Sequence, residues 1–190
     1  MWGAASPVGG AALGKPSLVA QRRIGRTNAP QWDALHRRAD LAQRVQQLED
    51  RAALKALVDT FSILADRKDV QRQVLLFTED ATVDSYTAGQ RGSSLRGRRQ
   101  IGDAFGAFLA RFTTVYHMNG QQAVTLNGDR ATGTSYCLVV LIGTEGGRTV
   151  RQTMGVRYDD EYVRRGASWL IAKRVSHFEW QDRAEVAASR

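Results

Sequence analysis

The sequence predicts an α+β fold in which three N-terminal helices pack against a curved, mainly antiparallel sheet to form a cone-shaped α+β barrel. Two observations carry this prediction. Apolar residues recur at helical spacings up to about residue 112, and strand-length segments separated by turn signals follow. The chain has 190 residues, 43% of them hydrophobic and 24% charged, which suits one domain with a sizeable core and an appendage.

The appendage is the N-terminal stretch. Residues 1–30 are rich in Gly, Ala, Ser and Pro, contain no acidic residue and show no helical or strand periodicity, so we expect residues 1–32 to be a disordered basic leader. Residues 1–38 carry a net charge of +5, out of +8 for the whole chain. Because the charge is concentrated in this tail and no nucleic-acid-binding motif accompanies it, we do not expect nucleic acid to be a partner.

The same region bears on location. Its arginines and lack of acid resemble an organelle transit peptide, whereas Lys15 and Pro16 interrupt the apolar run that a secretory signal needs. No run of 18 apolar residues occurs, so we expect no membrane-spanning helix and a cytoplasmic protein. The single cysteine, Cys137, excludes an intrachain disulfide and is expected to be buried.

The first half of the folded part is predicted to be helical. From about residue 33 to residue 65, apolar side chains recur every three or four residues, which predicts one or two amphipathic helices with a single packing face. These side chains are Leu41, Val45, Leu48, Ala52, Leu54, Leu57, Val58, Phe61 and Leu64. Asp69 is a good N-cap for a second, short helix reaching Phe77. A third helix is expected from near Arg98, with an apolar face of Ile101, Phe105, Phe108 and Phe112.

The remainder reads as strands. A brief strand at 82–86 is followed by the Gly- and Ser-rich segment 87–96, which we expect to be a mobile lid. Four strands are then predicted at residues 114–126, 130–142, 148–164 and 168–180, and Asn127-Gly128 is the strongest of the turn signals between them. We therefore place one domain at residues 33–182 and a C-terminal tail at residues 183–190.

Several short motifs occur in a fixed order through this domain. They are Ala65-Asp66-Arg67-Lys68-Asp69, Phe77-Thr78-Glu79-Asp80-Ala81, Tyr116-His117-Met118 and Asn127-Gly128-Asp129-Arg130-Ala131. Their order and spacing over residues 40–180 resemble the SnoaL-like branch of the nuclear-transport-factor-2-like superfamily, whose relatives include scytalone dehydratase, hexachlorocyclohexane dehydrochlorinase and ketosteroid isomerase. The resemblance also suggests that the outer face of the sheet joins subunits, which favours a homo-oligomer, a dimer or trimer.

In scytalone dehydratase and the dehydrochlorinase, an aspartate and a histidine at these motif positions form a catalytic dyad. The resemblance therefore implies that Asp66 and His117 are the dyad of this chain. Four positions depart from scytalone dehydratase, which has two tyrosines, a second histidine and an asparagine there: Ala65, Ser85, Leu141 and Tyr158. The dyad transfers from the resemblance, but the residues that would handle scytalone do not.

The residue types themselves suit proton transfer. An imidazole with a pKa of about 6.5 takes and returns protons near neutral pH, and a carboxylate bound to one ring nitrogen fixes the tautomer and leaves the other nitrogen as a base. His117 would be that base and Asp66 its orienting partner. Six further side chains are candidates for substrate binding, to polarise a carbonyl, assist a leaving group or line the cavity: Phe61, Tyr86, Tyr136, Tyr158, His177 and Trp180. Without the resemblance, Asp66 and His117 would read as structural polar residues.

Two classes of function remain. Three scattered histidines and the absence of a glycine-rich nucleotide loop give no reason to expect a metal or another cofactor. The first class is a cofactor-independent lyase, a dehydratase or a related eliminating or isomerising enzyme, acting on a small cyclic hydrophobic molecule. The second is a non-catalytic module of the same fold that binds a hydrophobic ligand or a protein. A close contact of Asp66 with His117 beside an apolar pocket favours the first class, and a collapsed cavity favours the second.

Overall fold

The computed structural model describes residues 29–186, and the compact unit that carries the sheet begins at Leu41. The predicted leader, residues 1–32, falls almost entirely outside the described residues. The elements, in chain order, are α1 (Ala29–Asp66), α2 (Val70–Gln73), the 3-10 helix η1 (Val74–Leu76), β1 (Phe77–Thr87), β2 (Gln90–Arg96), α3 (Gly97–Leu109), β3 (Phe112–Asn127), β4 (Arg130–Glu145), β5 (Arg148–Arg165) and β6 (Ser168–Glu185).

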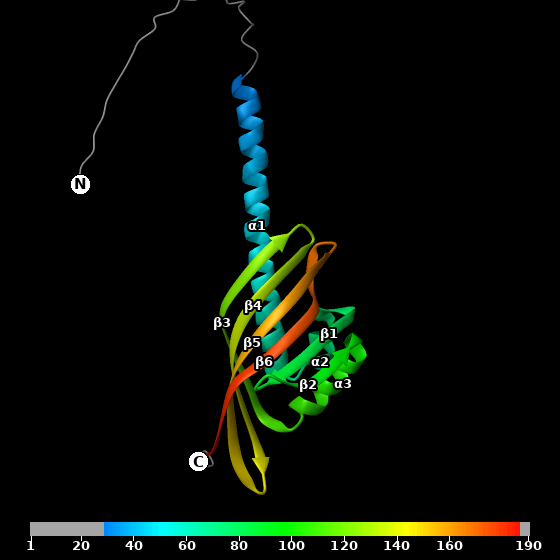
Figure 1. Ribbon diagram of the computed structural model, residues 1–190, viewed down its shortest axis with the longest axis vertical. Helices are drawn as coiled ribbons and strands as arrows, with labels where there is room; N and C mark the ends of the chain where they lie inside the picture. Colours follow the sequence, from blue (N-terminus) through cyan, green and yellow to red (C-terminus); the bar gives the residue numbers. More distant parts are fainter. Residues whose placement is uncertain (1–28, 187–190) are drawn as a thin grey trace, which may run out of the picture. The chain divides into compact units, whose positions relative to one another are not determined.

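The strands form one six-stranded sheet with the order β2-β1-β6-β5-β4-β3 (Figure 1). All neighbouring pairs are antiparallel except β1 and β6, which are parallel. The α+β class and the mainly antiparallel sheet are therefore confirmed. β2 and β3 are the two edges, so this curved sheet stays open and does not close into a barrel.

The four late strands occur where the turn signals predicted them, and each extends somewhat beyond its predicted end. β6 continues through Glu185, which pairs with Val150, so the strand enters the segment expected to be a C-terminal tail. The predicted lid at residues 87–96 is wrong. Thr87 ends β1, residues 90–96 form β2, and the turn at Ala88 and Gly89, both with positive φ, folds β2 back onto β1.

The helices differ from the prediction at their ends. Asp69 caps α2 as expected, because its carboxylate accepts a hydrogen bond from the Arg72 backbone N–H at 3.1 Å. The periodic apolar residues Phe77 and Phe112, however, begin β1 and β3 instead of extending the preceding helices. Both phenylalanines are buried, as predicted, but they belong to strands and not to the helical repeat to which they were assigned.

Within residues 41–66 of α1, the side chains that pack on the sheet come from the C-terminal part. Leu54, Val58 and Phe61 are buried in the core, whereas Leu41, Val45 and Leu48 are exposed. The single packing face predicted for residues 41–64 is therefore wrong. Leu48 lies two residues before the buried Asp50, and two residues correspond to a rotation of about 200° around a helix. Leu48 therefore points away from the face that buries Asp50. No helix in the described part of the chain is long and apolar enough to cross a membrane.

Candidate active site

A series of hydrogen bonds fixes α1 along the edge strand β3. Gln122 donates through Nε2 to the Leu54 carbonyl at 3.3 Å, and Asn119 donates through Nδ2 to Asp59 Oδ1 at 3.0 Å. The Ser62 hydroxyl then donates to Asn119 Oδ1 at 3.0 Å. Because the strand and the helix run in opposite directions, the next contact along both elements joins β3 to the last residue of α1.

That last residue is Asp66. The chain leaves the helix through Lys68, whose φ of 56° is left-handed, and the Asp69 backbone N–H donates back to the Leu64 carbonyl at 2.9 Å. Lys68 also donates through Nζ to the Phe112 carbonyl at the start of β3. The helix end is thus held against β3 by its own cap and by a side chain.

Asp66 and His117 are in direct contact. Asp66 Oδ1 lies 2.6 Å from His117 Nδ1, and Asp66 Oδ2 accepts a hydrogen bond from the His117 backbone N–H at 3.3 Å. Only 8% of the His117 side chain is exposed, against 25% of Asp66. Because the carboxylate occupies Nδ1, the bound tautomer carries its proton there and leaves Nε2 without one. This is the arrangement that a general base needs.

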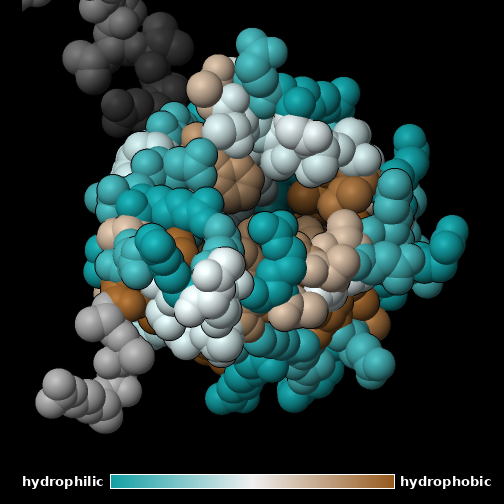
Figure 2. Space-filling view, turned by 90° about the horizontal axis from the view of Figure 1, so that it is seen from below, coloured by the Kyte–Doolittle hydropathy of each residue, from teal (hydrophilic) through white to brown (hydrophobic). Residues whose placement is uncertain are grey.

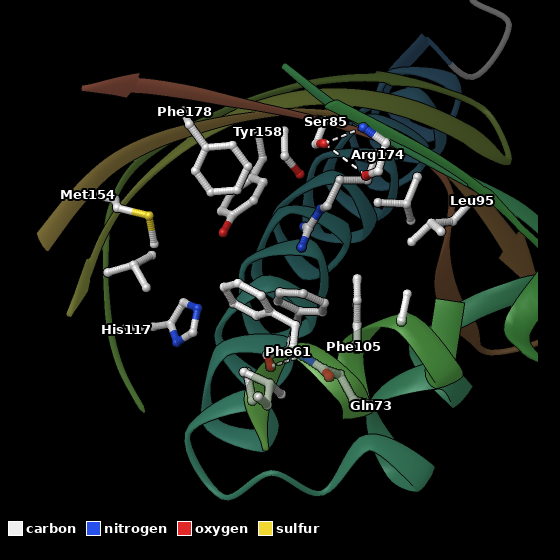
Figure 3. A pocket seen from close by; sticks show the side chains of 18 of the residues that line it. Phe61, Gln73, Ser85, Leu95, Phe105, His117, Met154, Tyr158, Arg174 and Phe178 are labelled. Atoms are coloured by element: carbon white, nitrogen blue, oxygen red, sulfur yellow. Dashed lines mark hydrogen bonds between the residues drawn. The ribbon is translucent and has the colours of Figure 1, made fainter. Parts of the chain in front are cut away.

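His117 lies on the wall of an apolar cavity of about 310 Å³. Most of the wall comes from the concave side of the sheet and from α1 and α3, and includes Phe61, Val83, Phe105, Leu109, Val139 and Leu141. Figure 2 shows a recess with hydrophobic walls opening among hydrophilic side chains, and Figure 3 shows His117 and Phe61 at the cavity. The cavity is not collapsed, and its size suits a small ring compound.

The surroundings of His117 favour its neutral form. Burial lowers the pKa of the imidazole and outweighs the carboxylate of Asp66, which raises it, while the positive charge of Arg174 lowers the pKa further. The net pKa is below the ordinary histidine value, so the ring is neutral and able to accept a proton at pH 7.

The structure separates the six predicted substrate-binding residues into two groups. Phe61 and Tyr158 line the cavity. The other four, Tyr86, Tyr136, His177 and Trp180, do not line it. Tyr136 and Trp180 are half-exposed, and the rings of Tyr86 and His177 stack on each other at 5.6 Å.

Register explains why these four side chains are not at the cavity. Tyr86 pairs with His177 across β1 and β6, so the two side chains share one face of the sheet. Buried Ser176 alternates with His177 on β6, and buried Ser135 and Cys137 flank Tyr136 on β4, so both rings point to the outer face. Strict alternation from Ser176 would point Trp180 inward. The β5–β6 pairing shifts register between Val156 and Gly155, so Trp180 pairs with Gly155 and points to the outer face. The assignment of these four residues to substrate binding is therefore not retained.

The positions that depart from scytalone dehydratase all line the cavity: Ala65, Ser85, Leu141 and Tyr158. Burial raises the pKa of the Tyr158 hydroxyl well above its usual value, so this hydroxyl stays protonated at neutral pH. The buried Cys137 thiol has its pKa raised to about 12, which keeps it from acting as a nucleophile at pH 7.

Arg174 is the one buried cation at the cavity wall among the described residues, and it was not among the predicted site residues. Its Nε and Nη2 donate to Asp160 at 2.8 and 2.7 Å, and the Tyr162 hydroxyl donates to the same carboxylate at 2.8 Å. Alternation from the buried Trp169 and Ile171 would place Lys173 inside. A bulge in the β5–β6 pairing shifts the inward series to Arg174 and Ser176.

Comparisons with known proteins agree with the fold. Residues 46–175 match the SnoaL-like domain family. An uncharacterized protein of Mycobacterium tuberculosis (strain ATCC 25618 / H37Rv) is 28% identical over 132 residues, which cover 69% of this chain and 86% of that protein.

Two solved structures share the fold. A scytalone dehydratase-like protein from Novosphingobium aromaticivorans superposes with a TM-score of 0.63 at 19% identity, covering 75% of this chain and 93% of that one. The type 3 hexachlorocyclohexane dehydrochlorinase of Novosphingobium barchaimii LL02 gives 0.62 at 19% identity, covering 77% and 96%. Since the family match spans more than half of its residues, this chain belongs to the SnoaL-like domain family.

Proposed function

We propose that the protein is a cofactor-independent lyase, a dehydratase or a related eliminating or isomerising enzyme, that uses His117 to remove a proton from a small cyclic hydrophobic substrate. One observation carries the proposal: Asp66 Oδ1 lies 2.6 Å from His117 Nδ1, and the same histidine lines an apolar cavity. An oriented, neutral imidazole beside a space for a ring compound is what proton abstraction from carbon requires.

In the elimination, His117 Nε2 takes a proton from a ring carbon next to a carbonyl, and the electron pair of the broken C–H bond moves toward the carbonyl oxygen. The pair then returns from the oxygen to form the ring double bond, and the bond from the neighbouring carbon to its hydroxyl breaks. The imidazolium gives its proton to the departing hydroxyl, which leaves as water. Asp66 holds the ring in place and stabilises the imidazolium between these two steps.

The relatives support this class of reaction. One structural neighbour is named for a dehydratase and another for a dehydrochlorinase, and both reactions are eliminations. The second candidate is a binding module of the same fold. The open cavity with a histidine on its wall favours the enzyme over that alternative. A cytoplasmic location stays a prediction from the sequence.

The experiment uses 5-nitrobenzisoxazole, a small aromatic probe that needs only a base to remove one C–H proton, after which its N–O bond breaks and a coloured phenolate forms. We expect the protein to form this phenolate faster than an equal concentration of free imidazole, because the cavity holds probe and base together. If the rate does not exceed that of free imidazole, the cavity presents no functional base and the binding-module alternative stands.

We further propose a homo-oligomer, a dimer or trimer, joined through the outer face of the sheet. Met118, Leu138, Gly155 and Trp180 pair in one row across β3, β4, β5 and β6. Met118, Leu138 and Trp180 are 53%, 36% and 52% exposed, and Tyr116 and Tyr136 are also exposed. An apolar patch of this kind favours association with another protein surface.

Leu138→Glu tests this surface, because it would bury a charge at the centre of the row. We expect the wild-type protein to sediment as a dimer or trimer and Leu138→Glu to shift toward the monomer mass. Leu75→Glu is the control, since Leu75 is 56% exposed on η1, outside the sheet. A monomeric wild-type protein, or an equal shift in both variants, would contradict the proposed interface.

A further inference from the structure

Arg174 is held rigidly at the cavity. Asp160 binds its guanidinium through two parallel hydrogen bonds, and only 1% of the side chain is exposed. The guanidinium carbon lies 4.2 Å from the centre of the Phe61 ring and 4.3 Å from that of Tyr158, so the two aromatic rings flank the cation. The group is therefore fixed in orientation before any ligand binds.

One nitrogen of this guanidinium is left over. Asp160 uses Nε and Nη2, whereas Nη1 is buried and has no hydrogen-bond partner. A guanidinium carries two N–H groups on Nη1, and a buried donor without an acceptor is costly, so such groups are rare in folded proteins. Arg174 lines the cavity, and Figure 3 shows its side chain reaching into it among the aromatic rings.

Six other polar side chains share the wall with Arg174, and none of them carries a positive charge at neutral pH: Gln73, Ser85, Ser93, His117, Tyr158 and Ser176. Val83, Leu95, Val139 and Leu141 supply only apolar atoms there. Asp160 balances the positive charge of Arg174, so the pair has little net charge with which to attract anions. What it offers a ligand is a hydrogen-bond donor at short range. The acceptor that gains most from a charged N–H donor is an oxygen that bears negative charge, or that develops it during a reaction.

We propose that Nη1 of Arg174 binds an oxygen of the ligand, and that the ligands of this cavity are apolar ring compounds bearing a carbonyl or phenolate oxygen. This inference rests on the same cavity as the proposed function and narrows its substrates. A ketone oxygen at Nη1 would accept one N–H hydrogen bond, and the same contact would strengthen when proton removal turns the ketone into an enolate. Purely halogenated or hydrocarbon rings would leave the donor unpaired.

The test compares two probes that differ by one oxygen, 4-nitrophenolate and nitrobenzene, in binding to the whole protein by calorimetry above the pH at which the phenol ionises. We expect wild-type protein to bind 4-nitrophenolate at least about tenfold more tightly than nitrobenzene, through a charge-assisted hydrogen bond. Arg174→Lys retains a cation for Asp160, but its single nitrogen replaces the two that bind Asp160 and leaves no counterpart of Nη1 for the ligand. This variant should therefore lose the preference for 4-nitrophenolate, while its affinity for nitrobenzene stays unchanged.

Two further variants keep the outcome clear. The double variant Arg174→Met with Asp160→Asn removes both charges together and should behave as Arg174→Lys does, even if the lysine variant is unstable. Lys173→Met removes the neighbouring exposed cation and should keep the preference. Calorimetry measures binding without turnover, so failure of the proposed reaction would leave the preference in place and is distinguishable. Equal affinity for both probes, or a preference that survives in Arg174→Lys, overturns the inference.

Discussion

Replacing His117 by glutamine lowers the rate of 5-nitrobenzisoxazole conversion by about 10²- to 10⁴-fold, the usual contribution of a general base. The amide of glutamine can still meet Asp66 Oδ1, which lies 2.6 Å from His117 Nδ1, but it has no nitrogen able to accept the proton. The measurement is the initial rate of phenolate formation at saturating probe and neutral pH, so that a change in affinity does not enter.

His177→Gln is the matched control for this prediction. It makes the same chemical replacement at a histidine that stacks on Tyr86 and does not line the cavity, so its rate should equal that of the wild type. The rate of Asp66→Asn should lie between those of His117→Gln and His177→Gln, because the base remains but its tautomer is no longer fixed. A His117→Gln protein that is as active as His177→Gln would remove His117 from the mechanism.

Asp160→Ala lowers the free energy of unfolding by about 3–5 kcal/mol, the cost of leaving a buried charge without its partner. Arg174 would keep its full charge with 1% of its side chain exposed, and the Tyr162 hydroxyl would lose its acceptor as well. The measurement is urea unfolding followed by tyrosine and tryptophan fluorescence, with the slope of the transition compared between variants.

Asp129→Ala is the control for stability. Asp129 also pairs with an arginine, Arg164, at 3.0 Å, but 83% of its side chain is exposed. An exposed ion pair contributes about 0–1 kcal/mol, so this variant should unfold almost as the wild type does. Similar losses in Asp129→Ala and Asp160→Ala would mean that the Arg174–Asp160 pair is not a buried, mutually dependent unit.

Much of the fold could be predicted from the sequence, because it depends on local signals. Asn127-Gly128 and the other turn dipeptides marked the hairpins, and the four strands occur at the predicted places. The lid at 87–96 was misread because its Gly and Ser residues are typical of loops, whereas pairing with β1 holds them as a strand. Phe77 and Phe112 were misread because a buried aromatic residue fits either period.

Within the site, sequence signals located positions better than they located side-chain directions. The resemblance brought Asp66 and His117 together, and the structure has them in contact. A direction on a strand depends on register, and each bulge reverses it from that point on. Two bulges in the pairing of β6 with β5 decide that Arg174 faces the cavity and that Trp180 faces outward, and Gly155 is the one residue at these shifts whose type favours a bulge.

In the proposed reaction His117 is a neutral base, protonated at Nδ1 toward Asp66 and unprotonated at Nε2 toward the cavity. This protonation state can be read from ¹⁵N NMR of the histidine rings through a pH titration, with the His117 signals identified by their loss in His117→Gln. We expect the Nδ1–H tautomer at neutral pH and a pKa below about 6.5, because burial lowers it. Lowering the pH through that pKa protonates the base, so activity should fall only on the acidic side. An Nε2–H tautomer, or a ring that is already protonated at neutral pH, would mean that His117 is not the base.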